Sequence, residues 1–249
     1  MAQNLIALLS DARKVSLKTD KISAYILESK DLSLLKPLWQ NLEKEVEQVA
    51  LTSQWDWVET WLTNYGDVVK PSFIIGVQKE KIVGIALISQ ETHSPLPLPV
   101  KALHVGTNGE PFKEQIRMIE NKFLVLASVK KLFLTALIDT LLTAYPYEEI
   151  VFDDYAVSDA VVMQKVLDEK KIKYIAETER CTQFDLDVAR AEKRDILSYL
   201  GKHTKHSLSR NIRAFDNDVR LEWAEDKQTA LSILDEMIDL YQKKWKKMG

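Results

Sequence analysis

The sequence predicts a mixed α/β protein with one complete domain and the beginning of a second. Apolar β-rich runs alternate with segments whose apolar residues recur at three- and four-residue steps, which are the periods of strands and helices. Two of the β-rich runs are separated only by a polar turn at 78–81, as in an antiparallel hairpin. After residue 188 the pattern restarts with a basic helical segment, one strand and one long helix, which together are too small to bury a core.

The first half of the predicted domain is a strand, two helices and a hairpin. The strand is expected at 21–27, where apolar positions alternate. One helix is expected from its N-cap Ser33 and a second from its N-cap Ser53 to the stop at Tyr65-Gly66. The apolar stripe of the first helix is Leu35, Leu38, Trp39, Leu42 and Val46. The hairpin strands are expected at 72–77 and 82–88.

The second half is expected to complete a mixed sheet with helices on it. Its elements are, in order, a strand at 100–105, a helix from Ser128 to Pro146, a strand at 149–153, a helix capped by Ser158, and strands at 172–175 and 182–186. These elements complete a predicted domain at 1–188. Residues 189–249 then hold a basic segment, a strand at 219–223 and a long amphipathic helix. We expect this second unit to pack against the first domain or to be the beginning of a longer domain.

Composition narrows the class of protein. Hydrophobic residues make up 46% of the 249 positions, charged residues make up 29%, and the formal net charge is -3. Because the net charge is nearly balanced, the protein has no strong overall electrostatic field that would attract nucleic acid or a membrane surface. The single cysteine, Cys181, excludes an intramolecular disulfide and suits a reducing compartment. No run reaches the roughly 20 apolar residues of a membrane span, and the apolar run at 5–9 has no basic residue before it. We therefore expect a cytoplasmic protein without a signal peptide.

Three local motifs occur within this element order. The first is Trp55-Asp56-Trp57 with Trp61 and Tyr65-Gly66, the second is GTNGEP at 106–111 with IENKFL at 119–124, and the third is LSRNIRAF at 208–215 with Leu221-Glu222 and LYQKKW at 240–245. Taken together they resemble the FemAB/CelD-like branch of the GNAT acyltransferases, which carry two GNAT domains in tandem. The resemblance implies a GNAT-like fold that is complete in the first domain and incomplete in the second.

The same resemblance implies a function. It is acyl transfer from acetyl-CoA or another acyl-CoA, as the thioester donor, to an amine acceptor in a cell-envelope or polysaccharide precursor, without a metal. An alternative stays open, because residues 123–127 before the helix at Ser128 contain no glycine to bring the backbone close to a pyrophosphate. This alternative is a non-catalytic GNAT-like binding domain, or a remnant that lacks the acyl-donor site. Enzyme activity is expected where the full tandem is present.

The loop at 106–111 is the best candidate for a functional surface. Asn108 and Gly109 tolerate positive φ, and Glu110 and Glu114 are carboxylates that can act as base or proton relay on an amine. Asn108 and Gly109 are the candidate substrate-binding residues of this loop, and the resemblance adds Asn121 as a third. The competing interpretation is an ordinary turn with solvated acids.

The basic segment at 202–213 is the candidate phosphate contact. Lys205, Arg210 and Arg213 can hold phosphates of an acyl-CoA, although a solvated linker face is the competing interpretation. Aromatic residues do not interleave with these cations, so no specific nucleic-acid partner is expected. His104 is expected to be a packed strand residue. His203 and His206 have no carboxylate or cysteine at metal-ligand spacing, so no metal is expected.

Overall fold

The structure is a computed structural model. It describes residues 2–15, 21–28, 32–90, 100–111, 113–116, 120–179, 188, 191–193, 196–214 and 224–246. The chain divides into two compact units, 1–176 and 177–249. The predicted boundary between 188 and 189 stays a prediction.

Among the described residues of the first unit, one mixed sheet of seven strands forms the centre. The strands are β1 (Arg13–Val15), β2 (Ser23–Leu27), β3 (Ser72–Gln78), β4 (Lys81–Gln90), β5 (Ala102–Val105), β6 (Leu124–Val125) and β7 (Glu149–Val151). Their order is β1-β2-β3-β4-β5-β7, with β6 also paired to β4. All pairs are antiparallel except β5 with β7. The predicted hairpin is confirmed as β3 and β4, joined through Lys79 and Glu80, which both have positive φ.

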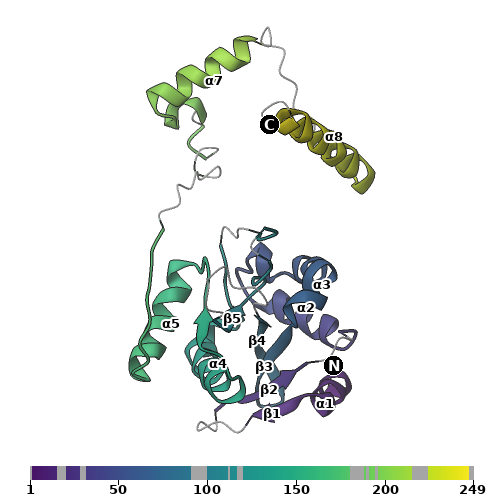
Figure 1. Cartoon of the computed structure of the whole chain (residues 1–249), viewed down its shortest axis with the longest axis vertical. Coiled ribbons are helices and arrows are strands. Elements are labelled where there is room, and N and C mark those ends of the chain that lie inside the picture. The colour runs from purple at the N-terminus through teal and green to yellow at the C-terminus, as the bar shows by residue number, and fades with distance from the viewer. Residues whose placement is uncertain are drawn as a thin grey trace. The chain divides into compact units, whose positions relative to one another are not determined.

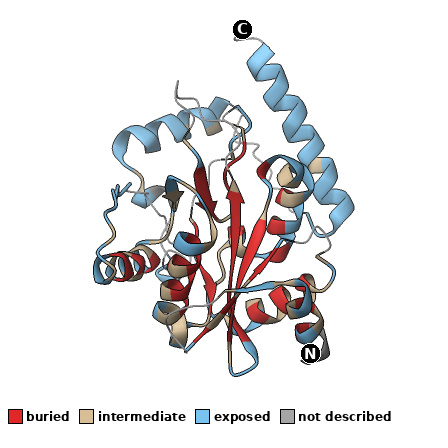
Figure 2. Ribbon diagram, turned by 60° about the horizontal axis from the view of Figure 1, so that its bottom comes forward, coloured by how far each residue is buried: buried red, intermediate tan, exposed pale blue. Residues whose placement is uncertain are grey.

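Helices cover both faces of this sheet (Figure 1). The helices of the first unit are α1 (Ala2–Asp11), α2 (Leu35–Glu45), α3 (Trp55–Val69), α4 (Lys130–Ala144) and α5 (Val157–Glu169). One core cluster joins α4 and α5 to one face of the sheet, and the other joins α1, α2 and α3 to the opposite face. Buried residues therefore run through the sheet and the inner sides of the helices (Figure 2). The predicted α/β class is confirmed, and the predicted elements occur in the predicted order as far as α5, with α1, β1 and β6 as additional elements that were not predicted.

The predicted strand at 172–175 is wrong. These residues form no regular structure, and Ile175 is 93% exposed. Ile172 instead closes α5, because its N–H donates to the carbonyl of Leu167 at 3.0 Å and its side chain packs against the α4 and α5 core. The apolar side chain of Ile172 therefore packs at the end of a helix and is not part of a strand. The predicted strands at 182–186 and 219–223 lie outside the described residues.

The predicted helix caps are also wrong, although the helices are present. The observed N-cap residues are Leu34, Gln54, Val129 and Ala156, and none makes a capping hydrogen bond through its side chain. At α3 a tertiary partner takes the place of a local cap, because the N–H of Trp55 at the start of this helix donates to the carboxylate of Glu43 in α2. The helix α3 also continues beyond Gly66 to Val69, since a lone glycine inside a helix is tolerated.

The N-terminal elements were not predicted. The apolar run at 5–9 belongs to α1, which buries Leu5 and Leu8 against α2 and α3. After α1, β1 adds to the edge of the sheet beside β2. Among the described helices, none is both long and apolar enough to cross a membrane.

Helices make up most of the described part of the second unit. It contains η3 (Ile196–Tyr199), α7 (Lys202–Ala214) and α8 (Lys227–Lys246). The predicted stripe of α8 is exposed, with Leu234, Ile238 and Tyr241 at 48%, 44% and 63%. The basic segment forms α7 as a helix, as predicted.

Candidate functional site

The site begins at a break in the sheet. Two separate strands pair with the same edge of β4: β5 lies opposite 88–90, and β6 lies opposite 84–85. The described residues between these two strands, 106–111, 113–116 and 120–123, leave the sheet and then return to it. On the returning stretch, Asn121 forms a parallel bridge to Tyr155 beyond the end of β7. The break therefore places a loop at the carboxyl ends of the two parallel strands, where α/β sheets commonly bind ligands.

The predicted loop is folded into the protein and is not a solvated turn. Thr107, Asn108 and Glu110 are 1%, 5% and 4% exposed. The hydroxyl of Ser89 in β4 donates to the carbonyl of Asn108, whose side-chain oxygen accepts the N–H of Gly109 at 2.8 Å. Gly109 has φ of 92°, a conformation that favours glycine. The interpretation as an ordinary turn with solvated acids is therefore wrong for Glu110.

Two tryptophans of α3 hold the loop from the other side. The indole N–H of Trp57 donates to the hydroxyl of Thr107 at 3.0 Å. The indole N–H of Trp61 donates to Oε1 of Glu110. The first motif of the sequence, which contributes both tryptophans, thus contacts the second motif. Core packing alone does not explain these aromatic residues, because both use their polar N–H groups.

Glu110 is the most unusual of the predicted residues. Its Oε2 is buried and has no hydrogen-bond partner among the described residues. Desolvation by burial raises the pKa of Glu110, and the hydrogen bond from Trp61 opposes this shift only in part. A buried carboxyl with one open oxygen is suited to taking up or giving a proton.

Asp153 ties the other predicted residues together. Its carboxylate accepts the amide N–H of Asn108, and its backbone carbonyl accepts the side-chain amide of Asn121 at 2.9 Å. The Nδ1 atom of His104 lies 3.5 Å from Oδ2 of Asp153. Asp153 was not among the predicted site residues. Its position just beyond a short strand that ends beside a parallel neighbour is the signal that could have found it.

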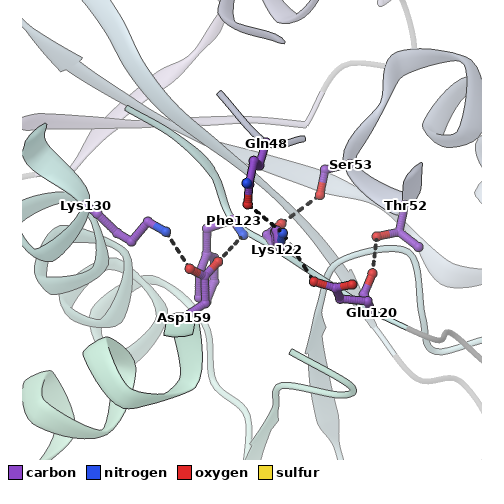
Figure 3. Close-up of polar contacts among 8 residues, drawn as sticks. All are labelled: Gln48, Thr52, Ser53, Glu120, Lys122, Phe123, Lys130 and Asp159. Carbon is purple, nitrogen blue, oxygen red and sulfur yellow. Dashed lines mark hydrogen bonds and ion pairs between the residues drawn. The ribbon is translucent and has the colours of Figure 1, made fainter. Parts of the chain in front are cut away.

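The returning segment at 120–123 is pinned from both sides (Figure 3). From the short helix η1 (Leu51–Ser53), the hydroxyl of Thr52 donates to the carbonyl of Glu120 at 3.2 Å, and that of Ser53 donates to the carbonyl of Lys122 at 2.7 Å. This second bond is why Ser53 does not cap α3. From the opposite side, the buried carboxylate of Asp159 accepts the N–H of Phe123 at 2.9 Å and pairs with Lys130 of α4.

A small cavity of about 30 Å³ lies at the break in the sheet. Its lining combines apolar residues with a few polar groups, among them Thr107, Asn121 and the phenol of Tyr155. The phenol of Tyr155 donates to the carbonyl of Val105 at 3.2 Å, and burial raises its pKa. This volume is enough for water, which requires about 10–15 Å³ on this measure. Tyr155 is a second residue that the sequence did not indicate.

The remaining predicted residues lie apart from this cluster. Glu114 is exposed in the following turn, where its backbone carbonyl accepts the phenol of Tyr65 at 3.4 Å. Lys205, Arg210 and Arg213 are exposed on α7, which belongs to the second unit. Their predicted roles stay predictions. Among the described residues, no group of three or more His, Cys, Asp or Glu side chains is placed to hold a metal ion.

Comparison with known proteins gives matches to solved structures only. No protein-family model matches the sequence, and no similar sequence was found among curated proteins. A ribosomal-protein-alanine N-acetyltransferase from Brucella melitensis biovar Abortus 2308 covers 66% of this chain and 99% of its own, with 13% identity and a TM-score of 0.35. A glucosamine-6-phosphate N-acetyltransferase from Arabidopsis thaliana covers 65% and 98%, with 14% identity and a TM-score of 0.36. An aminoglycoside N-acetyltransferase in complex with CoA covers 68% and 97%, with 14% identity and a TM-score of 0.36.

All three of these proteins are named as N-acetyltransferases. At such TM-scores the likeness carries no argument about this chain. The fold therefore rests on the sheet topology described above, and the function must be argued from the site itself.

Proposed function

We propose that this chain carries an acyltransferase site of the GNAT type, which moves an acyl group from a thioester such as acetyl-CoA to an amine. The observation that carries the proposal is Glu110, a buried carboxyl with a raised pKa and an open Oε2 on the loop at the break in the sheet. An amine attacks a thioester only when it is uncharged, so a base of raised pKa is needed to take its proton near neutral pH. Glu110 has these properties.

The leaving thiolate needs a proton donor at the same place. Tyr155 lines the cavity, and its phenol is protonated at neutral pH. In the proposed reaction the amine attacks the thioester carbonyl directly. Glu110 receives the proton from the amine, and the phenol donates a proton to the sulfur. Glu110 then releases its proton to water and Tyr155 takes one up from water, so that both side chains return to their starting states. Backbone N–H groups at the break polarise the carbonyl.

The first unit has only part of what binding of the acyl-CoA donor requires. Pockets for ligands of this size are roughly 300–1,000 Å³, whereas the cavity measures about 30 Å³. The start of α4 follows Ala127, Ser128 and Val129 without a glycine, and its first residue Lys130 already pairs with Asp159. Binding of a thioester therefore requires the break to widen. Lys205, Arg210 and Arg213 remain our proposed phosphate contacts.

The finer parts of the proposal concern the acceptor and the family. On the basis of the three sequence motifs, we propose that the acceptor is an amine of a cell-envelope or polysaccharide precursor. On the same basis, we propose that the protein has the FemAB/CelD-like tandem arrangement. The single cysteine and balanced charge support a cytoplasmic location.

A second candidate function is a non-catalytic binding domain of the same fold. The small cavity and the absence of glycine before α4 favour it. Under this alternative, Glu110 contributes only to the packing of the loop against Trp61.

Calorimetric titration with acetyl-CoA separates the two functions. We expect saturable binding, and we expect Glu110→Gln to retain this binding while transfer to a panel of amines, followed as released thiol, falls at least 100-fold. Glu169→Gln is the matched control, because Glu169 pairs with Lys131 at the surface of the first unit. Absence of binding at millimolar acetyl-CoA, or full activity of Glu110→Gln, would overturn the acyltransferase proposal for this chain.

A further inference from the structure

Asp153 is the residue on which the polar side chains around the break in the sheet converge. Its Oδ2 accepts the side-chain amide N–H of Asn108, and its backbone carbonyl accepts the side-chain amide N–H of Asn121 at 2.9 Å. These two asparagines are the predicted substrate-binding residues that have polar side chains. Because both direct an amide N–H to Asp153, the group that they hold in place is this residue and its carboxylate.

One oxygen of the Asp153 carboxylate is open. Oδ2 accepts from Asn108 and lies 3.5 Å from Nδ1 of His104. Oδ1 has no hydrogen bond or ion pair with any described residue, and no described Lys or Arg side chain pairs with Asp153. The side chain is 40% exposed. A ligand can therefore reach Oδ1 from solvent while Oδ2 stays fixed to the protein.

The backbone around Asp153 is also fixed next to the cavity. The N–H of Asn121 donates to the carbonyl of Asp154 at 2.7 Å, and the N–H of Ala156 donates to the carbonyl of Asn121 at 2.9 Å. Asp154 has φ of 53°, which is uncommon for a residue other than glycine. Asn121 itself lines the cavity. The carboxylate of Asp153 is therefore held in place beside a residue of the cavity wall.

The chemistry of the open oxygen favours an ammonium ion as its ligand. A carboxylate oxygen carries negative charge and only accepts hydrogen bonds, so its strongest partners are cationic donors. A Ca²⁺ ion needs about six to eight oxygen ligands, and the described residues hold no group of three or more His, Cys, Asp or Glu side chains that could bind a metal ion. An alkyl amine is protonated at neutral pH, as the side chain of lysine is. The acceptor of the proposed transfer therefore reaches the protein as an ammonium ion.

We propose that Asp153 binds the ammonium group of the acceptor amine through Oδ1. This inference rests on the proposed acyl transfer and adds to it the residue that recognises the acceptor. Asn108 and Asn121 are then positioning residues, because they act on the acceptor through Asp153. The ammonium group loses its proton after binding, in the transfer step in which Glu110 is the base.

Titration of the full chain with propylammonium chloride at constant ionic strength tests this contact without any activity. We expect a saturable shift of the Asn108 side-chain amide signals in NMR spectra, and no shift with 1-propanol, which has a similar shape and no charge. Asp153→Asn should raise the Kd of propylammonium at least tenfold. Glu120→Gln is the matched control, because the side chain of Glu120 is 43% exposed and already pairs with Lys122 at 3.2 Å (Figure 3).

Two results of this titration would contradict the contact. One is the same Kd for the wild type and for Asp153→Asn. The other is a shift of the Asn108 signals that 1-propanol produces as well, and this comparison needs only the wild-type protein if Asp153→Asn does not fold.

The acetyl-transfer assay gives a second readout. Asp153→Asn should raise the KM for the amine at least tenfold while the Kd of acetyl-CoA stays within twofold of the wild-type value, and Asn108→Ala should raise the same KM by a smaller factor. A lower kcat with an unchanged KM for the amine would overturn acceptor binding by Asp153. Absence of acetyl-CoA binding would overturn the proposed function and the acceptor role together, and the propylammonium titration separates that failure from a failure of the Asp153 contact.

Discussion

Replacing Gly84 by alanine is expected to destabilise the first unit strongly, because an aromatic ring already occupies the space of the new methyl group. Gly84 in β4 and Gly76 in β3 are opposite each other in the hairpin, and both lie against Phe133 of α4. A Cβ on Gly84 would lie 2.6 Å from Cδ2 and 2.8 Å from Cε2 and Cγ of that ring. Ordinary contacts of this kind measure 3.4–4 Å, so the ring must move by roughly 1 Å.

The magnitude follows from the burial of the ring. Phe133 is 1% exposed and belongs to the core between the sheet, α4 and α5, so it has no free space to move into. Overpacking of such a core costs about 1–3 kcal/mol, and we expect Gly84→Ala to lie near the upper end. In a chain of this size that corresponds to a fall in Tm of roughly 6–10 °C.

Urea denaturation followed by tryptophan fluorescence measures this effect. In the background Phe133→Leu, which removes the ring, Gly84→Ala should cost under about 1 kcal/mol, so that the double-mutant cycle shows a coupling of about 2 kcal/mol. Gly66→Ala is the control: its nearest neighbours are 3.9 Å away in α3, and alanine should stabilise the helix by about 0.5–1 kcal/mol. Equal losses for Gly84→Ala in the wild-type and Phe133→Leu backgrounds would refute the crowding argument.

Three further predictions concern charge and backbone. Burial raises the folded-state pKa of Glu110, so the stability associated with its protonated form is present below about pH 4.5 and is lost as the pH rises through the raised value. Glu110→Gln should therefore be more stable than the wild type at pH 8 but not at pH 4, and thermal melts at both values check this. Asp159→Ala leaves Lys130 without its buried partner and should cost about 3–5 kcal/mol in urea denaturation, whereas equal stability would show that this pair is dispensable. Lys79 and Glu80 have φ of 48° and 60° in the hairpin turn, so the double replacement by Asn and Gly should stabilise by about 1 kcal/mol in the same assay, and a loss would argue against this turn geometry.

The sites where local sequence reasoning failed share one physical cause. Ser53 is a good N-cap by sequence, but its hydroxyl bonds to the carbonyl of Lys122, which is 69 positions away. Ile172 has the character of a strand residue, but it packs on helices. In both cases tertiary packing competes successfully with the local preference, through Lys122 for Ser53 and through the core between α4 and α5 for Ile172.

The candidate site could also be predicted from the sequence only in part. The loop at 106–111 could be selected from the sequence because Asn108, Gly109 and Glu110 follow a strand. Their burial could not be predicted, because it depends on Trp57 and Trp61 from a helix that lies about 50 positions earlier. Asp153 and Tyr155 were missed for the same reason, since their contacts to the loop exist only when β7 lies beside β5.

The sequence by itself determined the α/β class, the central hairpin, the helices and the loop that follows β5, because hydrophobic period and turn chemistry are local properties. Only the tertiary structure decided that this loop is an interior element at a break in the sheet, that Glu110 is a buried carboxyl, and that Asp153 holds Asn108 and Asn121 together. These properties depend on desolvation and on contacts between residues far apart in the chain. Desolvation and these contacts arise only when the two layers of helices pack against the sheet.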